Sequence, residues 1–308
     1  MNLKIVFILC YIGILYFSCN AQVQKHAHKI YGFVLKPPAS VIHIKDNLYC
    51  SQIEISNINF GEYVYWMGKI YGKSSLKYLS SLPDPSVWNR VDPCLFVFSE
   101  QYFIFPNYDD YPVVGISQLQ AKEYCKWLSD RYFESMLIKE GIINMNPNQS
   151  EDSFFSIESY FSGTYNNIIP SKDIKHYPYF RLPNLRERAE ILAFSKQSII
   201  IKSKHNNPLH FNKLRWTSDN IQSDINPCYN EEVPTRMVSK KVKNRSKNSI
   251  FNLRGNVGEW LSEKNVSAGG GWVDKREIIL KEDTTTVMYP NAWTGFRVVF
   301  EWREWKNE

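Results

Sequence analysis

The most distinctive motif of this chain is a run of nine residues, Asn252-Leu253-Arg254-Gly255-Asn256-Val257-Gly258-Glu259-Trp260. Two further runs follow, Ala268-Gly269-Gly270-Gly271-Trp272 and Thr294-Gly295-Phe296-Arg297-Val298-Val299. Two more precede it, Pro112-Val113-Val114-Gly115-Ile116-Ser117 and Arg181-Leu182-Pro183. A turn that contains glycine lets backbone carbonyls point inward. Each run alone is weak evidence for a particular fold, whereas the five runs in this order are strong evidence.

The composition indicates a folded protein. The 308 residues suggest one or two domains. Hydrophobic residues make up 44% and aromatic residues 15%, which excludes a disordered chain. With 14 Gly and 15 Pro, a collagen-like or proline-rich rod is excluded as well. The net charge of +6 is mild and indicates no nucleic-acid partner. The basic run from Arg236 to Lys247 could contact acidic lipid or polymer, but without interleaved aromatic residues it is better interpreted as a solvated loop.

The first 21 residues are typical of an export signal. Lys4 precedes an apolar segment, residues 5–17, that is shorter than the roughly 20 residues a membrane span needs. Cleavage after Ala21 would release a soluble chain, whereas cleavage before Cys19 would leave a lipoprotein anchored through that cysteine. The predicted organisation is a signal peptide over 1–21, a linker over 22–44 and one domain over 45–302. The predicted location is the periplasm or the outer membrane of a cell envelope.

Four cysteines lie beyond the signal: Cys50, Cys94, Cys125 and Cys228. An oxidising compartment permits disulfides, and four cysteines allow three pairings. Four buried free thiols are an equally good interpretation, and the sequence does not choose between them. For Cys125 a buried thiol is favoured, because free cysteine is often buried.

Two strands and one helix are expected in the first third of the chain. A strand is predicted within residues 47–55 because polar and apolar residues partly alternate there. A helix is predicted from an Asn59 cap to about Tyr71, where Gly72 ends it. Residues 112–116 are predicted to form a short buried strand.

Two further helices begin with capping boxes. One starts at Ser117 with Gln120 and runs to about Glu134, and the other starts at Asn184 with Glu187 and runs for about twelve residues. The residues expected to face inward are Leu119, Ala121, Tyr124, Cys125, Leu128 and Tyr132 in the first, and Leu185, Ala189, Leu192 and Ala193 in the second. Few helices, long loops and many aromatic residues together predict an α+β domain with much irregular but packed structure.

Taken together, the five runs resemble the formylglycine-generating enzyme (sulfatase-modifying factor) family. The segment Ala121-Lys122-Glu123-Tyr124-Cys125-Lys126-Trp127-Leu128 adds to the likeness, which covers about residues 45–300. It implies an α+β fold similar to C-type lectins, with little regular secondary structure. Three segments resemble the branch found in gliding-motility and type IX secretion lipoproteins of Bacteroidetes, where the domain is part of an envelope machine: Glu54-Ile55-Ser56-Asn57, Tyr63-Val64-Tyr65-Trp66 and Leu82-Pro83-Asp84 with Val87-Trp88.

The same resemblance bears on catalysis. Active members of the family use copper held by two cysteine thiolates, and the soft thiolate suits Cu(I). In the family this pair lies between the last two runs, but here the interval 273–294 contains neither Cys nor His. A related branch binds iron through histidines, and no His-x-x-x-His pair exists here. We therefore predict no catalytic residue, no copper and a chain that leans away from being an enzyme.

The resemblance also implies a possible calcium site and a structural frame. The calcium ligands would be Asn252, Gly255, Val257 and Glu259, which supply the oxygen donors that a hard cation prefers. The alternative is a structural turn that binds no ion. Arg181, Trp260, Trp272 and Arg297 are interpreted as the frame, and Arg297 is expected to pair with a carboxylate inside the fold.

Three functions are in competition. The first is a non-catalytic envelope protein, either a component or a paralogue of a gliding-motility or type IX secretion lipoprotein. Its partners would be other envelope or secretion-machine proteins and, through a lipid anchor, the outer membrane. The second is a lectin-like module that binds a ligand through aromatic residues and calcium. The third is a metal-dependent oxidase of the family with an unrecognised site.

Overall fold

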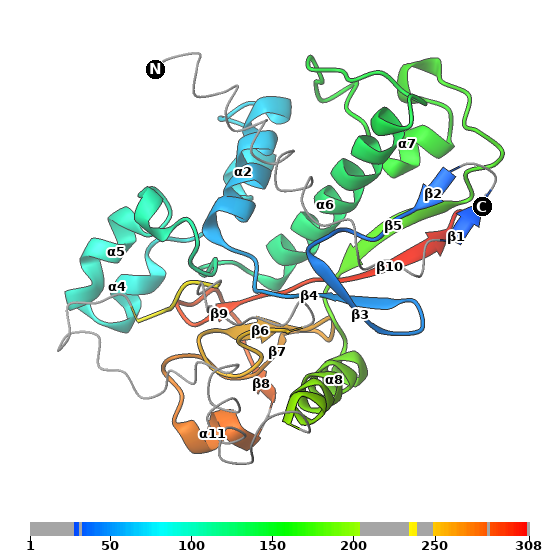
Figure 1. Cartoon of the computed structure of the whole chain (residues 1–308). Coiled ribbons are helices and arrows are strands. Elements are labelled where there is room, and N and C mark those ends of the chain that lie inside the picture. The colour runs from blue at the N-terminus through cyan, green and yellow to red at the C-terminus, as the bar shows by residue number, and fades with distance from the viewer. Residues whose placement is uncertain (1–27, 31–32, 204–233, 239–248, 282–283, 307–308) are drawn as a thin grey trace.

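The computed structural model describes residues 28–30, 33–203, 234–238, 249–281 and 284–306 (Figure 1). The predicted signal peptide with Cys19, the cysteine at 228 and most of the basic run from Arg236 lie outside these residues. Within the described part of the chain, no helix is long and apolar enough to cross a membrane.

The fold is a mixed α+β arrangement with small sheets and few long helices, as the sequence predicts. In the first half the elements are β1 (His28–Ile30), β2 (Phe33–Leu35), β3 (Val41–Lys45), β4 (Leu48–Ser51), α2 (Asn57–Tyr71), α3 (Leu76–Leu79), α4 (Val87–Val91), η1 (Pro93–Leu95), α5 (Phe96–Gln101), η2 (Pro106–Tyr108) and α6 (Gln118–Lys139). The second half has α7 (Ile157–Phe161), η3 (Tyr165–Asn167), β5 (His176–Arg181), α8 (Leu185–Ser203), β6 (Gly258–Trp260), β7 (Val266–Ala268), α11 (Arg276–Lys281), β8 (Thr284–Thr286), β9 (Thr294–Gly295) and β10 (Val299–Glu304).

Two four-stranded sheets organise the molecule. The first has the order β3-β4-β10-β5 and is antiparallel throughout, so β10 lies between strands from opposite ends of the sequence. The second has the order β8-β7-β6-β9, with β6 and β9 parallel. β1 and β2 form a separate pair.

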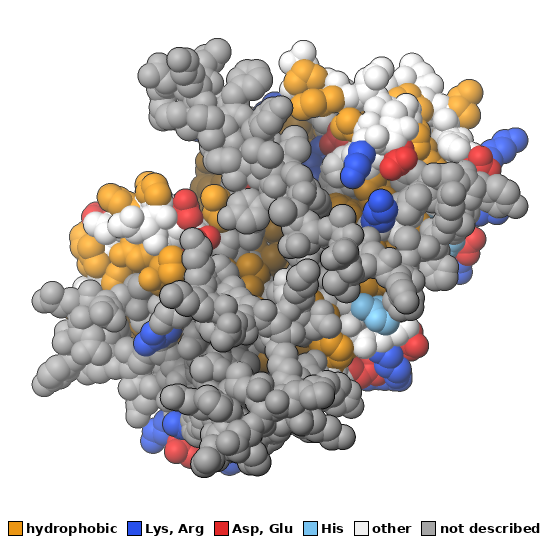
Figure 2. All heavy atoms as spheres, in the orientation of Figure 1, with side chains coloured by type: hydrophobic (Ala, Val, Ile, Leu, Met, Phe, Trp, Pro, Cys, Tyr) orange, Lys and Arg blue, Asp and Glu red, His pale blue; other side chains and the backbone are white. Residues whose placement is uncertain are grey.

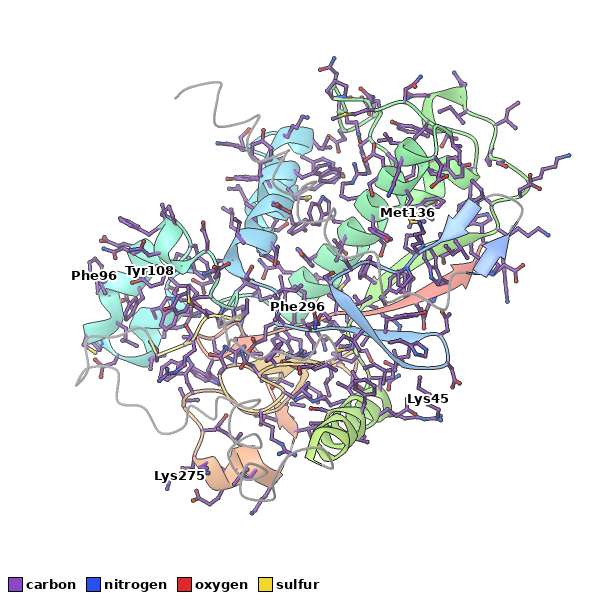
Figure 3. The ribbon with its side chains drawn as sticks, in the orientation of Figure 1. Lys45, Phe96, Tyr108, Met136, Lys275 and Phe296 are labelled. Atoms are coloured by element: carbon purple, nitrogen blue, oxygen red, sulfur yellow. The ribbon has the colours of Figure 1, made fainter. Side chains whose placement is uncertain are left out.

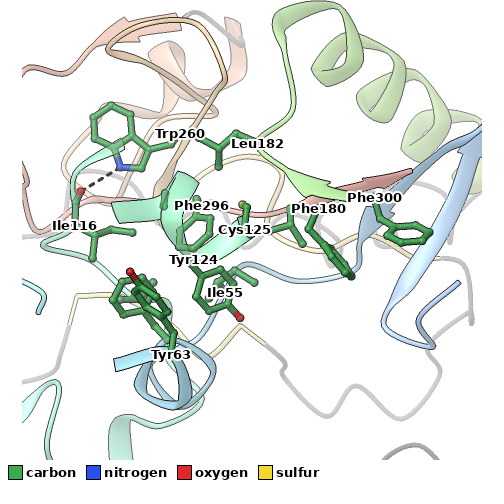
Figure 4. Close-up of a cluster of buried hydrophobic side chains, with 14 of the residues drawn as sticks. Ile55, Tyr63, Ile116, Tyr124, Cys125, Phe180, Leu182, Trp260, Phe296 and Phe300 are labelled. Atoms are coloured by element: carbon green, nitrogen blue, oxygen red, sulfur yellow. Dashed lines mark hydrogen bonds between the residues drawn. The ribbon is translucent and has the colours of Figure 1, made fainter. Parts of the chain in front are cut away.

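The first sheet separates two parts of the core. On one face, Tyr49, Phe180 and Phe300 pack with α6 (Figure 4). On the other face, Cys50 and Val299 pack with Ile191 and Leu192 of α8. Alternate residues of β4 and β10 therefore point to opposite cores, as the pleat of a strand requires. Figure 1 shows α6 and α8 on opposite sides of this sheet.

The predicted capping boxes are confirmed at both long helices. At α6, Ser117 accepts from the backbone of Gln120, and the Gln120 side chain accepts from the backbone of Ser117. At α8, Asn184 and Glu187 exchange the equivalent bonds at 2.8 and 2.9 Å. Both helices run further than expected, to Lys139 and Ser203.

Other expectations need correction. The cap of α2 is Ser56, whose side chain accepts from the backbone of Asn59, so the cap lies three residues earlier than predicted; Gly72 ends the helix as expected. Residues 112–116 are buried but make only an isolated bridge, between Pro112 and Ser56, and no strand ladder. The strand predicted within 47–55 is confirmed as the shorter β4.

The inward faces of both helices were predicted incompletely. Leu119 is 66% exposed, because the first turn of α6 buries Gln118 and Ala121 instead. Leu185, Ala189 and Ala193 are also exposed. The buried face of α8 holds Leu192, as predicted, together with Ile191 and Arg188.

Candidate functional site

The run 252–260 folds into a tight turn that leads into β6. Three of its residues have left-handed backbone conformations: Asn252 with φ 53°, Gly255 with φ 73° and Asn256 with φ 64°. Asparagine and glycine are the residues that tolerate this region best. The N–H of Gly255 donates to the carbonyl of Gly269 at 2.9 Å, which ties the turn to the glycine run 268–272.

The turn encloses a buried acid, Glu54, that the sequence reading had not selected. Asn252 Nδ2 donates to Glu54 Oε2 at 2.8 Å, and Asn256 Nδ2 donates to Glu54 Oε1 at 2.9 Å. Burial raises the pKa of Glu54 to about 8, although the charge of Arg297 nearby opposes the shift. Asn252 and Asn256 are thus committed to holding an acid in the core.

A second buried acid, Glu259, is held between two guanidinium groups. Arg297 Nε donates to Glu259 Oε1 at 2.7 Å, and Arg188 Nη1 donates to Glu259 Oε2. The expectation that Arg297 pairs with an internal carboxylate is confirmed. Arg297 also donates to three backbone carbonyls, those of Phe251 at 2.7 Å, Ser51 at 3.2 Å and Asn252 at 3.4 Å. All three charged side chains are almost completely buried.

Arg188 is the member of this centre that sequence reasoning missed. It is 4% exposed and donates through Nη2 to the carbonyl of Leu253. The inward face of this helix, α8, was predicted from apolar residues alone. A prediction of this kind cannot place an arginine in the core. Arg188 stands three and four residues before Ile191 and Leu192, so the helical repeat does place it on their face.

The predicted calcium ligands come together in one turn, but the carboxylate among them is engaged elsewhere, and the amide nitrogen of Asn252 holds a second acid. Both carboxylate oxygens of Glu259 face guanidinium groups, and Asn252 is bonded to Glu54. Calcium needs charged oxygen ligands, and Glu259 was the single carboxylate in the predicted set. Across the described ranges no group of three or more His, Cys, Asp or Glu could hold a metal ion. This donor set does not fit calcium in the arrangement observed.

The remaining predicted frame residues each make defined contacts. Trp260 Nε1 donates to the carbonyl of Ile116 at 3.2 Å (Figure 4), and Trp272 Nε1 donates to that of Ala292 at 2.8 Å. Arg181 binds Glu187 at 2.6 Å and Glu301 at 3.0 Å, linking α8 to β10. These contacts join separate elements of the fold.

The cysteines divide into two groups. Cys50 and Cys125 are free and buried. Burial raises the pKa of the Cys50 thiol to about 11 and raises that of Cys125 still further. Cys94 is disulfide-bonded, and its partner lies outside the described residues.

Small sheets, long packed loops and a buried arginine–glutamate centre define an α+β domain with little regular secondary structure. The chain belongs to the sulfatase-modifying factor enzyme 1-like domain family, whose sequence model matches residues 16–302. Among solved structures it is similar to one titled "Crystal Structure of CarF", with 13% sequence identity, coverage of 82% of this chain and 86% of that chain, and a TM-score of 0.39. No curated protein matches the chain.

Proposed function

We propose that this chain is a non-catalytic, exported protein of the cell envelope, related to gliding-motility and type IX secretion lipoproteins, that acts by binding a partner protein. The observation that carries the proposal is the condition of the two free thiols among the described residues. Cys50 and Cys125 are buried, and burial raises the pKa of both. Copper chemistry of this family needs exposed thiolates, and neither group supplies one near neutral pH.

The sequence supports the same proposal. No cysteine lies in the interval 273–294, where the family resemblance places the copper pair. The buried charged residues Arg188, Glu259 and Arg297 bind one another and backbone carbonyls. Their hydrogen bonds are therefore used within the protein and not for a substrate. A protein with this interior acts through its surface.

One surface region is suited to a partner. Phe96, Val97, Ile104 and Phe105 are exposed by 55, 41, 75 and 47%. We call this region the α5 face. In Figure 2 hydrophobic side chains gather over α4 and α5, with acidic side chains among them, and Figure 3 shows Phe96 at the outer edge of α5. Clustered exposed apolar residues typically mark interaction sites.

The charge around the α5 face indicates the chemistry of the partner. Residues 91–121 contain no Lys or Arg but include four acids, Asp92, Glu100, Asp109 and Asp110. This local negative charge contrasts with the net charge of +6 for the whole chain. A segment that carries both apolar and basic side chains would complement the α5 face, and opposite charge would speed its binding.

The decisive experiment is a gentle detergent extraction of the native envelope followed by capture on a C-terminal tag. We expect envelope or secretion components to co-purify with the wild type at fixed stoichiometry. The double variant Phe96→Ser, Ile104→Ser should lose them. The matched control is Leu76→Ser with Ile169→Ser, which changes two residues that are even more exposed (85 and 89%) but lie outside the α5 face. Capture of no partner by the wild type would overturn the proposal.

A separate assay tests the absence of catalysis. The purified protein is incubated with a cysteine-containing peptide of the Cys-x-Pro-x-Arg type, copper and oxygen, and the peptide is analysed for an aldehyde. We expect unchanged peptide. Aldehyde formation would show a functioning oxidase and would contradict the proposal directly.

The lipid anchor has its own test. Cys19→Ala should move the protein from the membrane fraction to the soluble envelope fraction if Cys19 is lipidated. A wild type that is already soluble would instead support cleavage after Ala21.

A further inference from the structure

We propose that Arg188 is a built-in cation that replaces a divalent metal ion at the turn 252–259, so that the chain folds without calcium. The first support is the set of atoms that Arg188 binds. Its guanidinium donates to a carboxylate oxygen of Glu259 and to the backbone carbonyl of Leu253. A carboxylate and backbone carbonyls are the kinds of oxygen a calcium ion takes from a protein loop.

The second support is the charge balance of the centre. Two buried cations, Arg188 and Arg297, face two buried acids, Glu54 and Glu259. The sum is zero when both acids are ionised and +1 when Glu54 is protonated. A calcium ion would add two further positive charges among side chains that are almost completely buried, and uncompensated buried charge is strongly unfavourable. The two arginines therefore leave no negative charge for a metal.

The third support is the space made for the guanidinium. Gly269 has φ +94°, and a Cβ atom at this position would lie 2.8 Å from Arg188 Nη2 and 2.8 Å from the carbonyl oxygen of Leu253. Any side chain there would collide with the contact itself. The chain therefore has a glycine at the point where the arginine from α8 meets the turn.

The position of Arg188 gives this cation a role that a free ion would not have. It belongs to α8, whereas Leu253 and Glu259 belong to the turn and to β6. Arg188 therefore links the helix to the second sheet through hydrogen bonds. Because this cation is part of the chain, the link does not depend on the calcium concentration around the protein.

The test compares thermal unfolding in EDTA and in calcium for the full chain and for Arg188→Ala. We expect the melting temperature of the wild type to be the same in both. Arg188→Ala should melt at least about 5 °C lower in EDTA and recover about 3 °C in about 10 mM Ca²⁺, since calcium can then reach Glu259 and Leu253 with an affinity typical of weak sites. If Arg188→Ala folds only on refolding with calcium, the same conclusion holds.

Two control variants make the comparison specific. Arg186→Ala alters an exposed arginine of the same helix and should change the melting temperature little in either buffer. Arg188→Lys keeps a charge and should remain indifferent to calcium, with a lower melting temperature because the planar fork is lost. A wild type that melts lower in EDTA, or that retains about one calcium per chain after dialysis, would overturn the proposal. So would an Arg188→Ala protein that does not respond to calcium.

Discussion

Glu259 has a guanidinium group on each of its carboxylate oxygens and almost no contact with water. Replacing it by glutamine leaves two buried arginines without their shared anion, so Glu259→Gln should cost about 3–5 kcal/mol in the free energy of unfolding. Urea titration followed by tryptophan fluorescence measures this cost. Glu190→Gln is the control, because Glu190 pairs with surface cations and should lose less than about 1 kcal/mol. Equal losses in the two variants would contradict the expectation.

Glu54 makes the stability of the protein depend on pH. In the unfolded chain a glutamate ionises near 4.5, whereas folded Glu54 keeps its proton up to about pH 8. Between these values the folded state binds more protons than the unfolded state. The free energy of unfolding therefore falls as the pH rises, by at most about 1.4 kcal/mol per pH unit for one group.

Glu54→Gln should flatten this dependence, because glutamine imitates the protonated acid at every pH. The measurement is the free energy of unfolding from about pH 6 to about pH 8. Asp130, whose pKa is raised by burial to about 6, acts in the same direction in the lower part of this range, so the slope above about pH 7 is the one assigned to Glu54. A variant with the same slope as the wild type would show that Glu54 is not the responsible group.

At this scale the sequence predicted both partners of the Glu259–Arg297 pair but only one partner of the Glu259–Arg188 and Asn252–Glu54 pairs. Glu259, Asn252 and Arg297 were selected from runs of neighbouring residues. Their partners Arg188 and Glu54 lie 71 and 198 positions from Glu259 and Asn252. No local pattern reports a contact at such a separation, and an arginine on a helix ordinarily indicates a solvated face.

Among the elements, the helix starts were predictable and the helix faces were not. A capping box is formed by residues three apart, so its signal is complete in the local sequence. The inward face depends on what packs against the helix. α6 continues past Glu134 because Phe133 and Leu137 pack with Phe155 of an irregular segment and with Tyr160 of the short helix α7. The residues around Phe155 show no hydrophobic periodicity from which this contact could be predicted.

Two glycines should respond to alanine in opposite directions. In Gly269→Ala, the new Cβ meets the Arg188–Leu253 contact at 2.8 Å, and the residue has a positive φ. This variant should lose more than about 1 kcal/mol, because the backbone and the packing both oppose it. Gly61 lies inside α2 with nothing within 4 Å of an added Cβ, so Gly61→Ala should gain up to about 1 kcal/mol. Chemical unfolding of both variants beside the wild type measures the signs, and a neutral Gly269→Ala would contradict the packing described.

For the whole molecule, the two buried thiols report whether its two cores open together. Cys50 packs with Ile191 on one side of the first sheet, and Cys125 packs with Trp260 on the other. β4 and β10 contribute residues to both cores, so we expect both thiols to become reactive in one transition. Alkylation followed by peptide mass spectrometry should give them the same denaturant midpoint. Ser135→Cys, at an exposed position of α6, should react without denaturant. Separate midpoints would show two independently unfolding parts.

The place of β10 in the first sheet sets the order in which the chain can assemble. β10 bonds to β4 on one side and to β5 on the other, although it is the last of the described strands to leave the ribosome. Until residues 297–304 have been synthesised, therefore, β4 and β5 lack the strand that joins them, and Glu259 lacks Arg297. The closure of the first sheet and the completion of the buried charge centre thus depend on the same short segment of the chain.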